Sequence, residues 1–208
     1  MNGIGALLLV AVALPMALAG GGPRLFFSRD FPGSLPPYIQ VTVEKGGEVE
    51  YREAADDDLP LKFKLDQTTT DTVFGLAEKL DYFKHPLDAP VKVAFMGTKT
   101  FRYEDGGQKT EVKFNFSQDV TAQTLLDWFE RMAETAQNRI SLERAAKYDH
   151  LGVMQALISL DASLERGRVA AAEQFLPLLD RIANNEVYMH TARVRAAAIA
   201  ETIRGAKK

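Results

Sequence analysis

Two segments of this chain share one pattern, in which an alternating apolar run, a Gly-Gly pair and a second alternating run follow each other. The first segment covers residues 38–53, and the second covers residues 98–116. Alternation places every second side chain on the same face of a strand, and paired glycines are typical of tight hairpin turns. The sequence therefore predicts two antiparallel hairpins whose apolar sides share one core.

The apolar residues also fix the register of both hairpins, because a slip by one residue would turn every side chain to the opposite face. In the first hairpin a three-residue loop aligns the apolar faces, and Gly47 can supply the left-handed residue that such a loop needs. In the second hairpin a two-residue loop at Gly106 and Gly107 aligns them. The expected cross-strand pairs are Val41–Tyr51, Val43–Val49, Phe101–Val112 and Tyr103–Thr110.

Further elements are predicted around the hairpins from the same patterns. The additional strands are expected at residues 24–28, 59–65 and 91–96. A helix with one apolar face follows the capping side chains of residues 66–70, and we expect it to stop at Pro86. A second helix is expected to begin at Asp119, which is a suitable N-terminal cap.

The composition changes near residue 138. Sixteen of the 19 aromatic residues lie between residues 20 and 138, whereas residues 139–208 carry three apolar stripes at helical spacing. We therefore predict an α+β fold: an antiparallel sheet of two hairpins plus two helices, followed by a small all-α helical bundle of about three helices. One helix can run through the boundary, because no Gly or Pro lies between Asp119 and Leu151.

The N-terminus has the pattern of a secretory signal peptide. An apolar run over residues 4–14 is followed by Pro15 and then by Ala17-Leu18-Ala19, which provides small residues at alternate positions. We expect cleavage after Ala19, and hence a signal peptide over 1–19, an α+β domain over 20–138 and a helical domain over 139–208. The expected location is periplasmic or extracellular, with no stable membrane insertion after cleavage. A retained membrane anchor is the alternative, since the apolar stretch approaches the length that spans a bilayer.

Composition excludes several kinds of chemistry. The chain has no cysteine, so it has no disulfide, no thiolate metal site and no cysteine nucleophile. A net charge of −3 gives no electrostatic footprint for nucleic acid, which is therefore not an expected partner. The three histidines, His85, His150 and His190, lack metal-binding spacing, and no nucleophile or phosphate-loop motif is present. We predict no catalytic, cofactor-binding or metal-binding residues.

Two segments carry a resemblance to a known family: Phe31-Pro32-Gly33-Ser34-Leu35-Pro36-Pro37-Tyr38 and Lys45-Gly46-Gly47-Glu48-Val49-Glu50-Tyr51. They resemble a domain of unknown function in bacterial secreted proteins and lipoproteins, which typically reads Phe-Gly-x-Cys-Pro-x-Tyr, a strand, Asp-Gly-x-Val-x-Tyr, a helix and a second hairpin. The order matches over residues 25–136. Leu35 stands where the family usually has cysteine, so no cysteine-dependent feature carries over. The resemblance implies export and architecture but no activity, and the second half is similar to a HEAT-like helical pair.

The first of these segments is also the candidate interaction surface. Its residues with contact area or rigidity are Phe31, Leu35, Pro36, Pro37 and Tyr38. Prolines hold a loop at low entropic cost, and aromatic side chains provide large contact areas. The alternative is a rigid crossover whose aromatic side chains enter the core.

We therefore predict an exported, non-enzymatic module that binds an unknown protein partner of the cell envelope or secretome. The alternative is a hydrolase or ligand-binding enzyme with a composite Asp/Glu/His site between the two domains. A cleft that holds His150 or His190 within hydrogen-bond reach of a carboxylate would favour the enzyme. An exposed apolar patch near Phe31–Tyr38 would favour the binding module.

Overall fold

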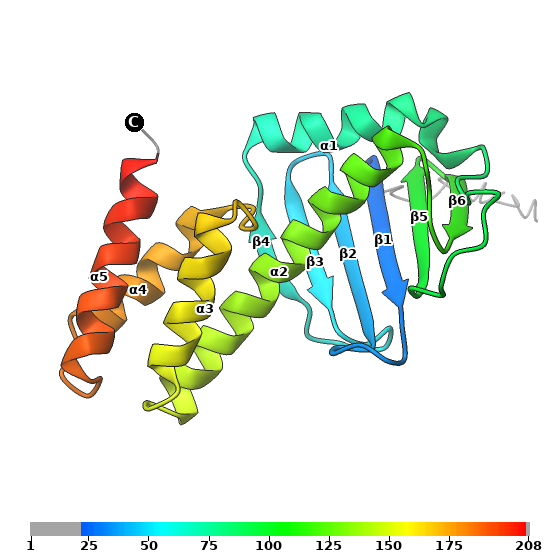
Figure 1. The fold of residues 1–208 in the computed structure, drawn as a ribbon. Helices are drawn as coiled ribbons and strands as arrows, with labels where there is room; N and C mark the ends of the chain where they lie inside the picture. Colours follow the sequence, from blue (N-terminus) through cyan, green and yellow to red (C-terminus); the bar gives the residue numbers. More distant parts are fainter. Residues whose placement is uncertain (1–21, 207–208) are drawn as a thin grey trace, which may run out of the picture.

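The computed structural model describes residues 22–206, so the predicted signal peptide over 1–19 lies outside the described residues. Six strands form one antiparallel sheet in the order β4-β3-β2-β1-β5-β6 (Figure 1). The strands are β1 (Arg24–Asp30), β2 (Tyr38–Glu44), β3 (Glu48–Arg52), β4 (Leu61–Lys64), β5 (Thr98–Asp105) and β6 (Gln108–Phe114). The helices are α1 (Gln67–Lys79), α2 (Val120–Tyr148), α3 (Val153–Glu165), α4 (Leu176–Ala183) and α5 (His190–Gly205), with short 3-10 helices η1 (Asp81–Phe83) and η2 (Ala172–Phe175). The chain is an α+β protein, as predicted.

Both hairpins have the predicted register. The observed pairs include Val41–Tyr51, Val43–Val49, Phe101–Val112 and Tyr103–Thr110. Gly47 has a φ of +89°, and a Cβ added there would lie 2.8 Å from the Leu65 carbonyl oxygen. Glycine is therefore required at Gly47 both by its backbone conformation and by the space available.

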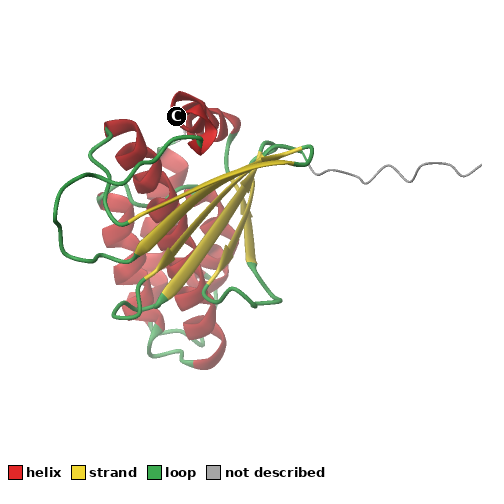
Figure 2. Cartoon of the chain, turned by 90° about the vertical axis from the view of Figure 1, so that its right-hand side faces the viewer, coloured by secondary structure: helices red, strands yellow, loops and turns green. Residues whose placement is uncertain are grey.

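The two faces of the sheet differ in what covers them. Helices α1 and α2 lie across one face, and the opposite face has no helix over it in the described part of the chain (Figures 1 and 2). Apolar side chains from the strands fill the covered side and pack against both helices, including Leu25, Phe27, Ile39, Val41, Phe101, Val73 and Phe129. This cluster provides the main stabilisation of the sheet, because it removes large apolar areas from water.

Two predictions about the chain between the hairpins are wrong. Residues 91–96 form no strand. The Asn115 side chain binds their backbone instead, accepting from the Met96 N–H at 2.8 Å and donating to the Ala94 carbonyl at 3.0 Å. The first helix ends at Lys79, well before Pro86. It ends early because the chain turns through η1, which buries Phe83 in the core.

Helix α2 passes through the predicted domain boundary at residue 138 without a break. Its first half packs on the sheet, and its second half contributes Leu142, Ala145 and Ala146 to a second apolar cluster with α3, α4 and α5. Asp119 caps this helix, as predicted, by accepting from the backbone N–H groups of Thr121 and Ala122. None of the described helices combines the length and the apolarity needed to cross a bilayer.

Candidate functional site

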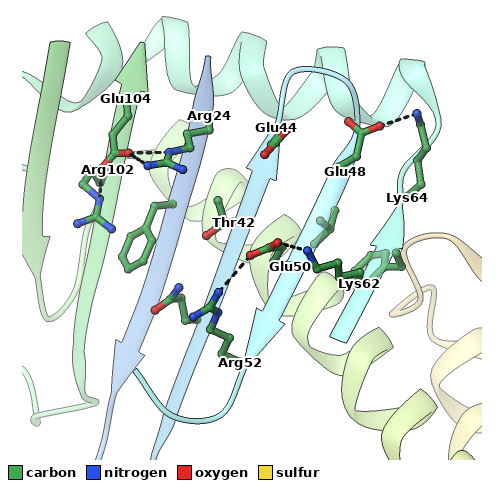
Figure 3. Close-up of a pocket in the computed structure, with 14 residues that line it drawn as sticks. Arg24, Thr42, Glu44, Glu48, Glu50, Arg52, Lys62, Lys64, Arg102 and Glu104 are labelled. Atoms are coloured by element: carbon green, nitrogen blue, oxygen red, sulfur yellow. Dashed lines mark hydrogen bonds and ion pairs between the residues drawn. The ribbon is translucent and has the colours of Figure 1, made fainter. Parts of the chain in front are cut away.

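The open face of the sheet contains the first candidate, a hollow of about 680 Å³ (Figure 3). Strand alternation directs charged side chains toward solvent there, and Figure 3 shows them standing above β1 to β5. The labelled residues of this hollow are Arg24, Thr42, Glu44, Glu48, Glu50, Arg52, Lys62, Lys64, Arg102 and Glu104.

These charges on the open face bind one another. Lys62 and Arg52 both contact Glu50, at 2.6 and 3.3 Å. Arg24 lies 2.5 Å from the Glu104 carboxylate, which also forms an ion pair with Arg102 at 3.1 Å. The cations of this hollow therefore already have carboxylate partners, and an incoming ion would have to displace them.

A second candidate lies on the covered side, at the end of the sheet where β1 leads into the β1–β2 loop. We call it the β1–β5 pocket. It has a volume of about 430 Å³. Its apolar walls are formed by Phe31, Met96, Phe114, Phe116, Ala122 and Leu126, and its polar residues are Arg29, Ser34, Lys99, Asn115, Ser117, Gln123 and Glu130.

Two cations face each other at this pocket. Arg29 of β1 is paired directly opposite Lys99 of β5, and both belong to the face that carries Phe27 and Phe101. Lys99 is only 6% exposed. Like charges directly opposite each other on neighbouring strands repel, and burial strengthens that repulsion. The pairing is therefore costly unless an anion compensates for it.

The carboxylates around these two cations lie at some distance from them or bind other groups. Glu130 of α2 is the carboxylate that lines the pocket among the described residues, and its nearest approach to Arg29 is 4.0 Å. It is equally distant, at 4.0 Å, from Arg168 in the segment after α3. Asp88 also acts on Lys99 but lines no wall of the pocket, and its carboxylate accepts from the backbone N–H groups of Asn115 and Phe116. Glu130 thus compensates both cations only in part, because its 4.0 Å approach to Arg29 is longer than a direct hydrogen bond.

The hydrogen bonds of the two cations are also incomplete. The Lys99 ammonium donates to the carbonyl oxygens of Asn115 at 2.8 Å and Met96 at 3.3 Å, which uses two of its three protons. The Arg29 Nε is buried and has no hydrogen-bond partner in the described part of the chain. A buried donor left without an acceptor is costly to the fold, and this nitrogen is closed to solvent.

The pKa of Lys99 reflects the same environment. Burial away from water lowers its pKa below the usual lysine value, and the neighbouring Arg29 lowers it further, while Glu130 and Asp88 act in the opposite direction. The surrounding carboxylates therefore do not offset the loss of hydration.

The predicted interaction segment borders this pocket. Phe31 lines it and is half-buried, in T-shaped contact with Phe95 at 6.0 Å between ring centroids. Leu35 is 99% exposed, and Pro36 and Pro37 stand beside it in the same loop. Tyr38 begins β2 and donates to the Gln40 side chain at 2.9 Å. The aromatic residues are thus neither fully exposed nor part of the central core.

Exposed apolar side chains continue from this loop onto residues 91–96. We define the apolar rim as Leu35 together with Val91, Val93, Phe95 and Met96, of which the last four are 44%, 42%, 59% and 43% exposed. Glycine at position 97 lets the two loops approach closely, because a Cβ at this position would lie 2.7 Å from the Phe31 Cβ. Met96 connects the rim to the pocket, since it is both exposed and part of the pocket wall.

The histidines lie elsewhere. His85 is exposed and lies 3.3 Å from Asp81. His150 packs its ring edge-on against Tyr188, at 5.2 Å between centroids. His190 borders a hollow with Asp161, whose carboxylate accepts from Arg195 at 2.7 Å. Within residues 22–206, no group of three or more His, Asp or Glu residues is arranged to hold a metal ion.

Sequence reasoning placed Phe31 beside the site but missed Arg29, Lys99 and Glu130. A signal for the two cations was present, because alternation from Phe27 and from Phe101 puts Arg29 and Lys99 on the apolar faces of their strands. A charged residue that continues a buried apolar stripe is unusual, and it indicates a candidate functional position. Glu130 carries no comparable signal, since it lies on a long helix with many other charges.

A scan of the chain against protein-family models finds no match, and no curated protein matches it. The resemblance to a bacterial domain of unknown function therefore stays a prediction.

Proposed function

We propose that this chain is an exported, non-enzymatic protein that binds a protein partner of the cell envelope or secretome through the apolar rim. The observation that carries the proposal is the exposure of five apolar side chains, Leu35 foremost, of which Met96 also lines an apolar pocket. Apolar side chains that gather on a surface in this way favour contact with another molecule, because association removes them from water. Export rests on the sequence pattern of residues 1–19.

The composite Asp/Glu/His site of the alternative hypothesis has less support. The described charged residues that join α2 to the segment after α3 are Arg166 and Arg168 with Asp127, Glu130 and Glu134, with no histidine among them. Arg168 donates to Glu134 at 3.0 Å, so this cluster ties the helical part of the chain to α2. The enzymatic reading remains a hypothesis without a site to favour it.

Site-specific photo-crosslinking tests the proposal. A photoreactive residue replaces Leu35 or Phe95 in the full chain, and Leu151, which is 76% exposed in the turn between α2 and α3, provides the control. After irradiation of producing cells, we expect protein adducts at positions 35 and 95 but not at 151, on chains outside the cytosol that begin at Gly20. Adducts that are equal at position 151, or missing from 35 and 95, would contradict the proposal.

A further inference from the structure

We infer that the β1–β5 pocket binds the anion of a medium-chain fatty acid, with the carboxylate held by Arg29 and Lys99 and the aliphatic chain along the apolar wall. This goes beyond the proposed partner binding and does not depend on it, because the two cations line the pocket and belong to no part of the rim, with which the pocket shares only Met96. Four properties of the site carry the inference: its charge, its free donors, its walls and its size.

The charge of the pocket fits a singly charged ligand. Arg29 and Lys99 contribute two positive charges to its lining, and Glu130 contributes one negative charge. One net positive charge is complementary to a carboxylate, whereas a phosphate monoester would bring an excess of negative charge. A guanidinium group also matches the planar geometry of a carboxylate.

The free donors fit the same headgroup. The Arg29 guanidinium lines the pocket, and Lys99 has a third proton beyond its bonds to Met96 and Asn115. A carboxylate has two oxygens that accept hydrogen bonds, so it can serve both cations at once and separate their charges. Binding would therefore reduce a repulsion between the two cations that the free chain retains.

The walls favour an aliphatic chain over a peptide. The polar side chains of the lining already have partners within the molecule: Ser34 donates to the Phe31 carbonyl at 2.9 Å, and Gln123 donates to the Ser117 carbonyl at 2.9 Å. The Asn115 amide holds Ala94 and Met96. A peptide backbone would need such groups free, since an unpaired amide is costly to bury, whereas a hydrocarbon chain needs none.

The size of the pocket sets the chain length. If each non-hydrogen atom takes roughly the ~30 Å³ share of a liquid water molecule, a volume of about 430 Å³ holds roughly 14 of them. Decanoate has ten carbons and two oxygens and fits within this limit. A much longer acid would extend past Met96 onto the apolar rim.

Calorimetric titration of the chain from Gly20 to Lys208 with sodium decanoate, below its micelle-forming concentration, tests the inference. We expect saturable binding of one decanoate per chain. Decanol has the same chain without the carboxylate, and we expect it to bind at least about tenfold more weakly, because charge-assisted hydrogen bonds are lost. Butyrate keeps the carboxylate but lacks most of the apolar contact, and it should also bind much more weakly.

Matched variants identify the site. Arg29→Gln and Lys99→Met should each weaken decanoate binding by about tenfold or more. Arg52→Gln and Lys64→Met change the same residue types on the open face and should leave it unchanged. Circular dichroism checks that all four variants fold. If Lys99→Met fails to fold, Arg29→Gln still tests the inference.

Three results would overturn the inference. Decanol binding as tightly as decanoate would show that the pocket recognises only the apolar chain. Equal effects of the open-face controls would place the ligand elsewhere. Binding of a peptide with a free C-terminal leucine at Arg29 and Lys99, without binding of decanoate, would assign the pocket to the end of a partner protein.

Discussion

The two faces of the sheet carry the same kinds of charged residue but surround them differently. On the open face, Lys62 lies 2.6 Å from Glu50 and Lys64 lies 2.8 Å from Glu48, with solvent beside each pair. On the covered side, Arg29 and Lys99 face each other, and the nearest approach of Glu130 to Arg29 is 4.0 Å. Surface pairs of the first kind contribute little and need no ligand. A buried cation opposite a half-buried one, with only partial compensation from Glu130, is costly to the fold, so the covered side is where we place the ligand.

The largest expected difference between the faces concerns their phenylalanines. Phe101 is fully buried on the covered side between Phe27, Phe83, Phe114 and Phe129. Phe101→Ala should lower the free energy of unfolding by about 3–5 kcal/mol, because it removes apolar contacts and leaves a cavity. Urea unfolding measures this loss.

Phe26→Ala is the matched control on the open face. The Phe26 ring lies under the Arg102 guanidinium, 3.7 Å from its centroid, and is partly solvated. Its loss should cost about 1 kcal/mol. Equal losses for Phe26→Ala and Phe101→Ala would contradict the assignment of one covered and one open face.

A smaller effect of opposite sign is expected at Lys99. Without ligand, Lys99→Met should raise the free energy of unfolding by about 1 kcal/mol, because it removes a buried charge that faces Arg29. Lys64→Met on the open face should leave stability unchanged within the error of urea unfolding, since the Lys64 side chain is 66% exposed. A clear loss of stability in Lys99→Met would show instead that its bonds to Met96 and Asn115 hold the 91–96 loop in place.

The stability difference between Lys99→Met and the unmodified chain should also depend on pH. The folded chain lowers the pKa of Lys99 below the usual 10.5, so the unfolded chain binds more protons between the two pKa values. Stability of the unmodified chain therefore rises with pH in that window. The advantage of Lys99→Met should be full below the folded pKa and lost above pH 10.5, when urea unfolding of both chains is compared. An advantage that stays constant with pH would contradict this.

Much of the sheet could be predicted from sequence because its information is local. Alternation and turn glycines specify the pair Val43–Val49 within one hairpin, and Asp119 alone marks the start of α2. The strand prediction for residues 91–96 is wrong because their alternating apolar residues have strand propensity, while the side chains of Asn115 and Lys99 bind their backbone.

The pocket could be predicted only in part. Phe31 was identified from a local pattern of aromatic and proline residues. The pairing of Arg29 with Lys99 depends on β1 lying between β2 and β5, which joins residues far apart in the chain. Glu130 reaches them only because α2 crosses that end of the sheet. Such contacts follow from tertiary packing, which periodicity within one element does not specify.

The side-chain Nε–H signal of Arg29 in a ¹H–¹⁵N NMR spectrum tests the central claim most directly, because it reports on the guanidinium that lines the pocket. Arg52 is the internal reference, since its Nε is also buried without a hydrogen bond but its guanidinium contacts Glu50 on the open face. Titration with decanoate should shift the Arg29 signal progressively to a saturating position and leave the Arg52 signal in place, and decanol should move neither. An Arg29 signal that does not respond to decanoate, or that moves together with Arg52, would contradict the account.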